Sequence, residues 1–420
     1  TNNFGMVKDR SMAVASETAK EPTVLSRRKL LCIAGMGWTF DAMDVGLLAF
    51  LLTALKEDWG LTAAQLGWIG SINSIGMAVG AFVFGIMADR KGRKPVFILT
   101  LLLFSLGCGL TALASSLMVV LILRFFIGMG LGGELPVAST LVSESVKAHE
   151  RGRIVVLLES FWAVGWLIAA LIAYFIIPDY GWRMAMLLSA LPAVYALYLR
   201  SKLPEPSSTQ SLLQNRLSLR QSMALIWSPQ YRRSTLMLWV LWFCVVFSYY
   251  GIFLWLPSVA MLKGFSLIKS FQYVLIMTLA QLPGYFTAAW FIERYGRKFV
   301  LITYLAGTAI SAYYFSVADS TTTLLVFGML LSFFNLGAWG ALYAYTPEQY
   351  PDGIRATGAG TATAIGRIGG ILGPLMVGYL VQYQFDISTI FLIFSLSIVI
   401  AILAVMLLGK ETKNRPLNSI

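Results

Sequence analysis

The chain has 420 residues, of which 58% are hydrophobic and only 12% are charged, and its formal net charge is +12. This composition is far more apolar than that of soluble domains, and it argues against a soluble enzyme. A helix that crosses the hydrocarbon core of a bilayer needs about 20 apolar residues, and the sequence contains twelve such stretches. It therefore predicts an all-α membrane protein with twelve transmembrane helices.

The predicted elements begin after a polar N-terminal tail, residues 1–29, which lacks the apolar core of a signal peptide. Short polar breaks separate most of the apolar stretches. The predicted spans are residues 30–55, 65–88, 95–115, 118–144, 153–177, 182–203, 234–260, 269–292, 298–318, 322–346, 356–383 and 387–409. A second tail, residues 410–420, follows the last span.

Basic residues are distributed unevenly among the loops. Most of the 32 Lys and Arg lie in the two tails and in the loops after the even-numbered spans, and the loop residues on the opposite side are Lys56, Arg183, Lys263 and Lys269. Cytosolic loops of membrane proteins carry such an excess, so the pattern predicts that both termini are cytosolic. The pattern also explains the net charge without nucleic acid, and no nucleic-acid partner is expected.

The longest hydrophilic break, residues 204–233, contains Pro204, Pro206 and several Ser, and it divides the spans six and six. The segment DRKGRK after the second span, residues 89–94, recurs as ERYGRK after the eighth, residues 293–298. Such a repeat indicates two halves related by internal duplication, as in transporters that bind substrate between their halves. The predicted units are the tail 1–29, the half 30–203, the linker 204–233, the half 234–409 and the tail 410–420.

The segment from Gly85 to Lys94 resembles the signature loop of the major facilitator superfamily. In it, Gly92 permits a tight turn, and Asp89 at a helix end can accept hydrogen bonds from a helix N-terminus or an arginine. The resemblance implies a latch of charged residues that holds one state of the transport cycle; the alternative is that these charges only set the topology. The predicted gating residues of the two repeats are Asp89, Arg90, Arg93, Glu293 and Arg297.

A second set of charges lies at the predicted cytosolic ends of spans 4, 5, 10 and 11. Glu144 with Arg151, and Glu348 with Arg355, have the same spacing in the two halves. They resemble the paired acid and arginine motifs of sugar-porter relatives, which implies that breaking such pairs separates the halves. The alternative is that they are solvated loop charges.

Four acidic residues lie inside predicted spans, where a charge at the bilayer centre costs about 2.5 to 3.5 kcal/mol. Asp41 and Asp44 share a face of the first span, and burial and mutual repulsion would favour protonation of one of them. Together with Glu134 they are the predicted proton-linked residues. The alternative for the two aspartates is a structural ion pair with Arg124 of the fourth span.

Arg367 lies in the middle of the eleventh span among glycines, and its planar fork suits a carboxylate. The alternative is a standing salt bridge to an acid such as Asp41. Polar and aromatic residues also share faces of the fifth and tenth spans, where packing is the alternative to ligand binding. The predicted substrate-binding residues are Arg367, Glu159, Trp162, Gln281, Asn335, Trp339 and Tyr343. The sequence suggests neither a metal site nor a cofactor.

Several motifs resemble those of the bacterial niacin transporters, and the match runs from Leu30 to Lys410. The motifs are WTFDAMDVG at 38–46, GGELP at 132–136, ESFW at 159–162, WGALY at 339–343 and GRIGG at 366–370. They are also similar to motifs of the organic cation and anion transporters and of the synaptic vesicle glycoprotein 2 proteins. In the anion transporters an arginine at the place of Arg367 is associated with anionic substrates. In the vesicle proteins tryptophans at the places of Trp162 and Trp339 flank a ligand.

The resemblance implies a secondary active transporter that takes up nicotinate across a bacterial cytoplasmic membrane by alternating access. Nicotinamide is a related candidate substrate, symport with protons is one expected mode of coupling, and a monomer is expected. Two alternatives are a proton symporter for another small aromatic acid and a membrane ligand sensor that does not transport. The sugar-porter motif after the sixth span is reduced to Leu203-Pro204-Glu205-Pro206, which argues against a sugar substrate.

Overall fold

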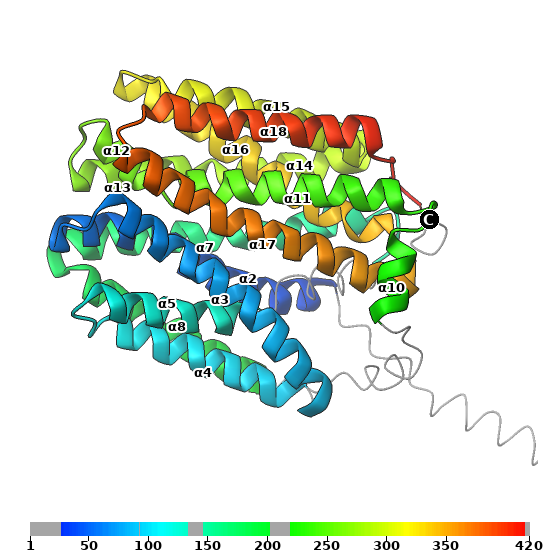
Figure 1. Ribbon diagram of the computed structural model, residues 1–420, viewed down its shortest axis with the longest axis horizontal. Helices are drawn as coiled ribbons and strands as arrows, with labels where there is room; N and C mark the ends of the chain where they lie inside the picture. Colours follow the sequence, from blue (N-terminus) through cyan, green and yellow to red (C-terminus); the bar gives the residue numbers. More distant parts are fainter. Residues whose placement is uncertain (1–26, 92, 133–145, 202–218, 416–420) are drawn as a thin grey trace, which may run out of the picture.

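The computed structural model describes residues 27–91, 93–132, 146–201 and 219–415 (Figure 1). Within these ranges every regular element is a helix. Nine helices of the described residues are long and apolar enough to cross a membrane, and three shorter apolar helices, Ile98–Thr111, Leu117–Leu131 and Trp182–Leu191, bring the spans to twelve. The predicted fold class, an all-α membrane protein with twelve spans, is confirmed.

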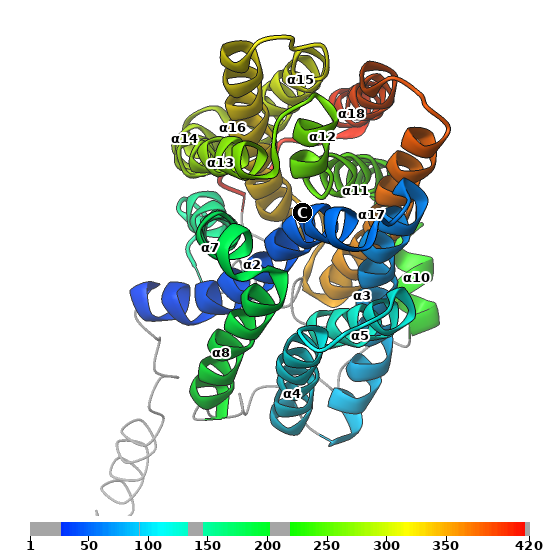
Figure 2. The same ribbon diagram turned by 90° about the vertical axis from the view of Figure 1, so that its left-hand side faces the viewer.

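The spans form two groups of six along the chain. The first half comprises α2 (Arg27–Trp59), α3 (Ala63–Lys91), α4 (Arg93–Thr111), α5 (Leu117–Leu131), α7 (Arg151–Tyr180) and α8 (Trp182–Ser201). The second half comprises α11 (Arg232–Phe253), α12 (Leu256–Leu262), α13 (Leu267–Leu279), α14 (Gln281–Tyr295), α15 (Arg297–Ser316), α16 (Thr321–Tyr345), η1 (Pro347–Gln349), α17 (Asp352–Gln382) and α18 (Ile387–Leu408). Figure 2 looks along most of the helices and shows α13 to α16 and α18 above, and α4, α5 and α8 below.

Two spans that the sequence predicted as continuous helices are interrupted near a proline. The ring of a proline clashes with the carbonyl four residues earlier, and the residue has no N–H to donate. Pro283 stands in this relation to Leu279, where α13 ends, and α14 begins at Gln281. Pro257 stands in the same relation to Phe253, where α11 ends. The first interruption places Gln281 at a helix end inside the bundle.

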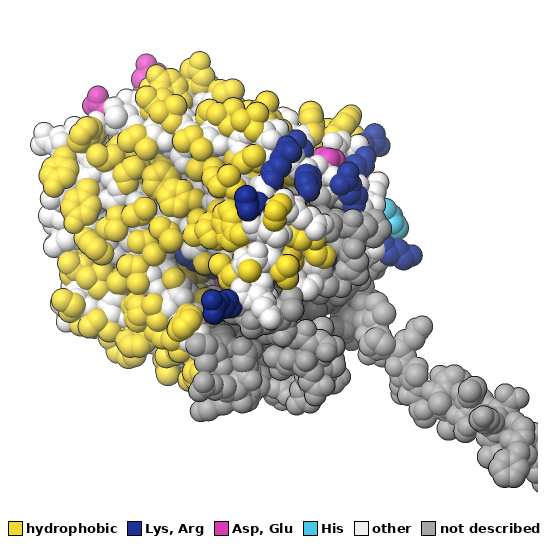
Figure 3. Space-filling view, turned by 45° about the vertical axis from the view of Figure 1, so that its right-hand side comes forward, with side chains coloured by type: hydrophobic (Ala, Val, Ile, Leu, Met, Phe, Trp, Pro, Cys, Tyr) yellow, Lys and Arg dark blue, Asp and Glu magenta, His cyan; other side chains and the backbone are white. Residues whose placement is uncertain are grey.

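The surface between the two ends of the bundle is largely apolar (Figure 3). Large hydrophobic side chains such as Phe82, Leu113, Phe175 and Leu407 are more than half exposed. Apolar surface of this extent on a soluble protein would be covered by a partner, and on helices of this length it faces the hydrocarbon core of a bilayer. The chain is therefore a multi-pass membrane protein.

Hydrogen bonds join the halves at both ends of the bundle. At one end lie α10 (Leu219–Ile226) and the C-terminus, and the Lys and Arg side chains in Figure 3 gather toward it; we call it the basic end. There an ion pair connects α7 to η1. At the opposite end Ser71 donates to the carbonyl of Ile371 at 2.6 Å, and the hydroxyls of Thr53 and Ser258 lie 2.8 Å apart. The residues between the halves are thus covered from both ends.

Two segments predicted as connecting or terminal chain are packed parts of the fold. Helix α10 lies within the predicted linker 204–233 and contacts α17. After α18, residues 410–415 lie along the basic end of the bundle. Thr412 of this segment is only 1% exposed. The described part of the predicted tail 410–420 bonds to helix ends of both halves.

Candidate functional site

Buried aromatic side chains from both halves meet where α7 packs against α16. We call Trp38, Trp162, Tyr249, Trp339 and Tyr343 the aromatic cluster, and each is 4% exposed or less. The ring centroids of Trp162 and Trp339 lie 6.4 Å apart with the planes inclined by 31°. Trp38 packs edge-on against Trp162 at 6.0 Å and against Tyr343 at 5.4 Å. The aromatic residues predicted to bind substrate therefore lie together.

Tyr249 ties this cluster across the two halves. Its hydroxyl accepts hydrogen bonds from Nε1 of Trp162 at 2.7 Å and of Trp166 at 2.9 Å, and its ring centroid is 4.7 Å from that of Trp339. The sequence did not single out Tyr249, because one tyrosine in an aromatic-rich span carries no distinguishing signal. Only the tertiary structure brings its hydroxyl between two indole donors.

Polar side chains in the cluster, or one helical turn from it, have buried atoms without a hydrogen-bond partner among the described residues. Within the cluster or one turn from it they are Trp38 of α2, Glu159 of α7, and Asn335 and Trp339 of α16, and Gln281 and Tyr285 of the neighbouring α14 are a further two. Each of these residues is 3% exposed or less. Buried polar groups are nearly always bonded, and an unbonded one costs about 1 to 3 kcal/mol. Several such groups between two halves are expected at a site that receives a polar ligand.

Arg367 reaches its position because α17 approaches α11 closely. A Cβ at Gly369 would lie 2.6 Å from the carbonyl oxygen of Phe243, so only glycine fits this contact. On the other side of the interface, Nη1 of Arg367 donates to the thioether of Met77 on α3 at 3.4 Å. A thioether is a weak acceptor, so this contact leaves the guanidinium able to bind an anion.

The guanidinium of Arg367 is not held by an acid in the part of the chain that the structure describes. It is 9% exposed, and the ion pairs of the described residues involve other arginines. A standing salt bridge to Asp41, the alternative interpretation of this arginine, is therefore not found. The Tyr343 hydroxyl lies within electrostatic reach of both Arg367 and Glu159, which connects the arginine to the aromatic cluster.

Asp44 forms the ion pair that was the alternative to its proton-linked role. Nη1 and Nη2 of Arg124 bond to the two carboxylate oxygens of Asp44 at 3.0 and 2.8 Å, and Nη2 also bonds to Asn73 at 3.2 Å. Both charged residues are 2% exposed or less. Asp41 is 6% exposed on the same helix and also has an interaction partner. Glu134 lies outside the described residues. A proton-linked role for these acids stays a prediction.

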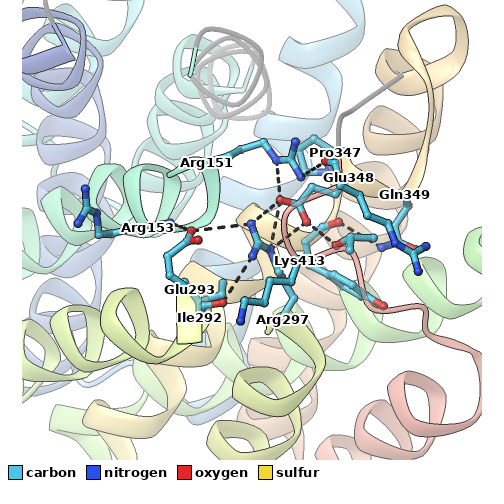
Figure 4. A network of polar contacts seen from close by, with 12 residues as sticks. Arg151, Arg153, Ile292, Glu293, Arg297, Pro347, Glu348, Gln349 and Lys413 are labelled. Atoms are coloured by element: carbon cyan, nitrogen blue, oxygen red, sulfur yellow. Dashed lines mark hydrogen bonds and ion pairs between the residues drawn. The ribbon is translucent and has the colours of Figure 1, made fainter. Parts of the chain in front are cut away.

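At the basic end Glu348 of η1 joins the two halves (Figure 4). Its Oε1 accepts from Nε of Arg151 at 2.7 Å and from Nη2 of Arg297 at 2.9 Å. All three side chains are 1% exposed or less. Arg151 begins α7 of the first half, whereas Glu348 and Arg297 belong to the second, so this predicted gating acid bridges the halves.

The segment after α18 completes this network. The hydroxyl of Thr412 bonds to Oε2 of Glu348, and the carbonyl of Arg415 accepts from Nη2 of Arg151 at 2.9 Å. The carboxylate of Glu411 accepts from the backbone N–H groups of Arg297 at 3.0 Å and of Lys298 at 3.2 Å, and so caps α15. Sequence analysis missed these residues, although an acid and a hydroxyl directly after the last span were a usable signal.

The other predicted gating residues are placed as follows. Oε1 of Glu293 accepts from the backbone N–H of Arg153 at 2.8 Å, a second bond between the halves. Arg355 is buried and donates to the carbonyl of Pro347 at 3.1 Å. Asp89 and Arg90 lie in the last turn of α3 and Arg93 begins α4, but their side chains, and Glu144 as a whole, lie outside the described residues. No group of three His, Cys, Asp or Glu among the described residues is placed to hold a metal ion.

Three similar proteins share most of their length with this chain. A protein of Bacillus subtilis named for niacin and nicotinamide transport, NiaP, is 62% identical over 94% of this chain and 98% of its own length. The niacin transporter NiaP of Acinetobacter baylyi is 48% identical over 93% and 95%. A synaptic vesicle 2-related protein of Xenopus laevis is 29% identical over 93% of this chain and 79% of its own length.

Among solved structures, the proton:xylose symporter XylE superposes with a TM-score of 0.71 at 19% sequence identity, over 93% of this chain and 97% of the other. At that identity the likeness concerns the fold alone. Two six-helix halves in one bundle are the architecture of membrane transporters that bind substrate between their halves. The family model of the Major Facilitator Superfamily matches residues 34–286 and 274–419, and the chain belongs to this superfamily.

Proposed function

We propose that this protein takes up nicotinate across the bacterial cytoplasmic membrane. The observation that carries the proposal is Arg367, a buried arginine without an acid partner in the described residues, near an aromatic cluster between the halves. A buried anion requires a paired charge, and the fork of an arginine can make two parallel bonds to one carboxylate. The names of two relatives, 62% and 48% identical, support niacin as the substrate.

In this proposal the carboxylate binds Arg367 and the pyridine ring lies between Trp162 and Trp339. The two indole centroids are 6.4 Å apart, whereas a ring stacked between them needs about 7 Å, twice a carbon contact distance of about 3.5 Å. Substrate entry therefore requires the halves to move apart at this point. The proposed polar partners of the ring are Tyr343, Gln281, Asn335 and Glu159.

The halves open in turn toward the two sides of the membrane. The gathering of Lys and Arg at the basic end supports a cytosolic position for that end and for both termini. The bond of Glu348 to Arg151 joins the two halves and is available only when the basic end is closed, so it favours the state that opens to the outside. Protons are the proposed coupling ion, and a single chain contains both halves of the site.

The test of the substrate assignment is equilibrium binding of labelled nicotinate to purified Arg367→Ala. Removal of one partner of a buried charge pair costs about 2 to 5 kcal/mol, which is about thirtyfold or more in Kd. Arg367→Lys keeps the charge but loses the fork and should bind with intermediate affinity. Nicotinamide has no carboxylate, so its binding should change less. Unchanged nicotinate affinity of a folded Arg367→Ala protein would remove the carboxylate assignment.

The second candidate function is symport of another small aromatic acid. It rests on the same arginine and aromatic cluster, which would recognise any flat monocarboxylate of this size. The two are distinguished by adding benzoate and other aromatic monocarboxylates to assays of nicotinate uptake into proteoliposomes. Stronger inhibition by one of these acids than by unlabelled nicotinate would favour the second candidate. The same assay tests the ligand-sensor alternative, since a sensor would bind nicotinate but show no uptake.

A further inference from the structure

Glu159 is the buried acid of the described residues that lacks a compensating group. It lies on α7, its side chain is fully buried, and neither carboxyl oxygen has a hydrogen-bond partner among the described residues. The other fully buried acids differ in this respect, because Asp44 is held by Arg124 and Glu348 by two arginines. Glu159 therefore stands apart chemically from the acids that stabilise the fold.

Glu159 lies on a helix of the first half that packs against the second half. Helix α7 of the first half packs against α13, α14 and α16 of the second. One turn before Glu159, the side chain of Val156 meets this surface: a Cβ added at Gly340 would lie 3.0 Å from Val156 and 3.1 Å from Tyr285. Opening of the basic end separates these helices, so it would expose Glu159 to water.

The titratable groups that face Glu159 are Tyr285 on α14 and Tyr343 on α16, and both are buried. Helices α2, α8 and α13 also pack against α7, but within the described residues they bring no charged side chain into electrostatic reach of this carboxyl group. An ionised carboxylate in such a place has neither water nor a counter-charge. Burying it is so costly that the group takes up a proton instead.

We propose that Glu159 binds the proton that is transported together with the substrate. In the state open to the outside, one carboxylate oxygen of Glu159 takes a proton from water and becomes a neutral acid, which allows α7 to close against α14 and α16. After the basic end opens, water reaches the group and the proton dissociates into the cytosol. The inference rests on the proposed uptake function, and it assigns proton coupling to a residue other than Asp41, Asp44 and Glu134.

The first experiment measures the Kd of nicotinate as a function of pH. If protonation of one group favours the closed, substrate-bound state, the affinity of the parent should rise by about tenfold for each pH unit lowered across the titration of that group. Glu159→Gln is neutral at every pH, so its Kd should not depend on pH, whatever its absolute value. The control is Asp179→Asn, an exposed acid of the same helix, which should keep the slope of the parent.

The slope of the Kd of nicotinate against pH shows whether Glu159 binds the coupled proton or only contacts the substrate. A contact would weaken binding by the same factor at every pH and leave the slope of the parent in Glu159→Gln. That result, or a flat profile in the parent itself, would overturn the proposal. The proposal is supported if the Kd of nicotinate depends on pH in the parent but not in Glu159→Gln.

The second experiment needs neither a variant nor nicotinate. Dicyclohexylcarbodiimide reacts with protonated carboxyl groups in apolar surroundings, and mass spectrometry of the parent protein locates the product. Glu159 should be modified, to a degree that falls as the pH rises, while Asp44 in its ion pair should remain unmodified. Modification of Asp44 with none at Glu159 would overturn the proposal. A parent that fails to bind nicotinate yet shows this labelling would instead refute the substrate and leave the proton site.

Discussion

At the scale of single residues, the buried charges divide into those with a partner and those without. Arg124 is held by Asp44 through two bonds, so the pair adds no net charge to the interior. Arg367 and Glu159 lack such partners in the described residues. Buried charges are kept where they bind a ligand or a proton, which is why we assign the substrate and the proton to these two residues.

We predict that Asp44→Asn destabilises the protein, because it leaves Arg124 as an uncompensated buried charge. Breaking such a pair costs about 3 to 5 kcal/mol, and thermal unfolding of the purified variant should show a clearly lower Tm. Asp319→Asn, an exposed acid at the opposite end, is the control and should change stability by about 0.5 kcal/mol or less. Parental stability of Asp44→Asn would show that the pair contributes little to the fold.

At the scale of secondary-structure elements, helix ends carry much of the specific chemistry. Pro283 ends α13 and so positions Gln281 within the bundle. At the basic end, Glu411 caps α15 from a segment that lies more than a hundred residues later in the chain. A carboxylate near a helix N-terminus bonds to free N–H groups and interacts favourably with the helix dipole.

We expect Glu411→Ala to release the segment after α18. Loss of a capping side chain costs about 1 kcal/mol, and the bonds of Thr412 and Arg415 to the gate depend on the position that the cap gives to this segment. Trypsin should then cleave after Lys413 faster than in the parent, as measured by intact-protein mass spectrometry. Asp386→Ala, at the opposite end of the bundle, serves as the control. Equal cleavage rates in all three proteins would argue that the cap does not hold the segment.

At the scale of the whole molecule, the halves are joined at both ends, and transport requires that these joints break in turn. Helices α3 and α17 meet at the opposite end, and Arg151 reaches Glu348 at the basic end. A mutation shifts the equilibrium between the two states only if it removes a contact that is present in one state and absent from the other. The ion pair at the basic end is therefore the place to bias the cycle.

Arg151→Ala should shift the protein toward the state that is open at the basic end. It removes bonds to Glu348 and to the carbonyl of Arg415, each a charge-assisted bond worth about 1.5 to 3 kcal/mol. Cysteines placed at Arg153 and Glu293 and bridged by a short bifunctional reagent should cross-link less efficiently in this background. Arg183→Ala, whose side chain binds carbonyls at the opposite end, is the matched control. Unchanged cross-linking would mean that the pair does not hold the gate.

Sidedness is tested by labelling intact cells with an impermeant maleimide. A cysteine at Thr321 (Thr321→Cys) should react, because this residue is exposed at the end opposite the basic end, whereas one at Arg220 (Arg220→Cys) on α10 should not. Of the three native cysteines, Cys108 and Cys244 are buried, and Cys32 is replaced by Ser in the labelled proteins, which limits background labelling. Reaction of the Arg220→Cys protein from outside would reverse the proposed orientation.

The sequence by itself determined the spans, their number and the twofold division, because the free energy of placing a residue in hydrocarbon depends mainly on that residue and its near neighbours. It also predicted Arg367, Trp162 and Trp339 as substrate-binding residues, since a charge or a tryptophan within a span is visible without a structure. The two interrupted helices show the limit of this local information, because periodicity alone did not place the breaks near Pro257 and Pro283.

The partners of the charges were decided only by the tertiary structure. Glu348 bonds to Arg151, 197 positions away, and nothing in its local sequence specifies this choice. For Arg124 the sequence offered either Asp41 or Asp44 as a partner, and the structure shows the bonds to Asp44, 80 positions away. The same holds for Glu159, whose carboxyl group has no hydrogen-bond partner among the described residues, because this depends on every described helix packed around it. Hydropathy is a sum over residues, whereas the pairing of buried charges depends on which helices meet, and that is set by the packing of the whole bundle.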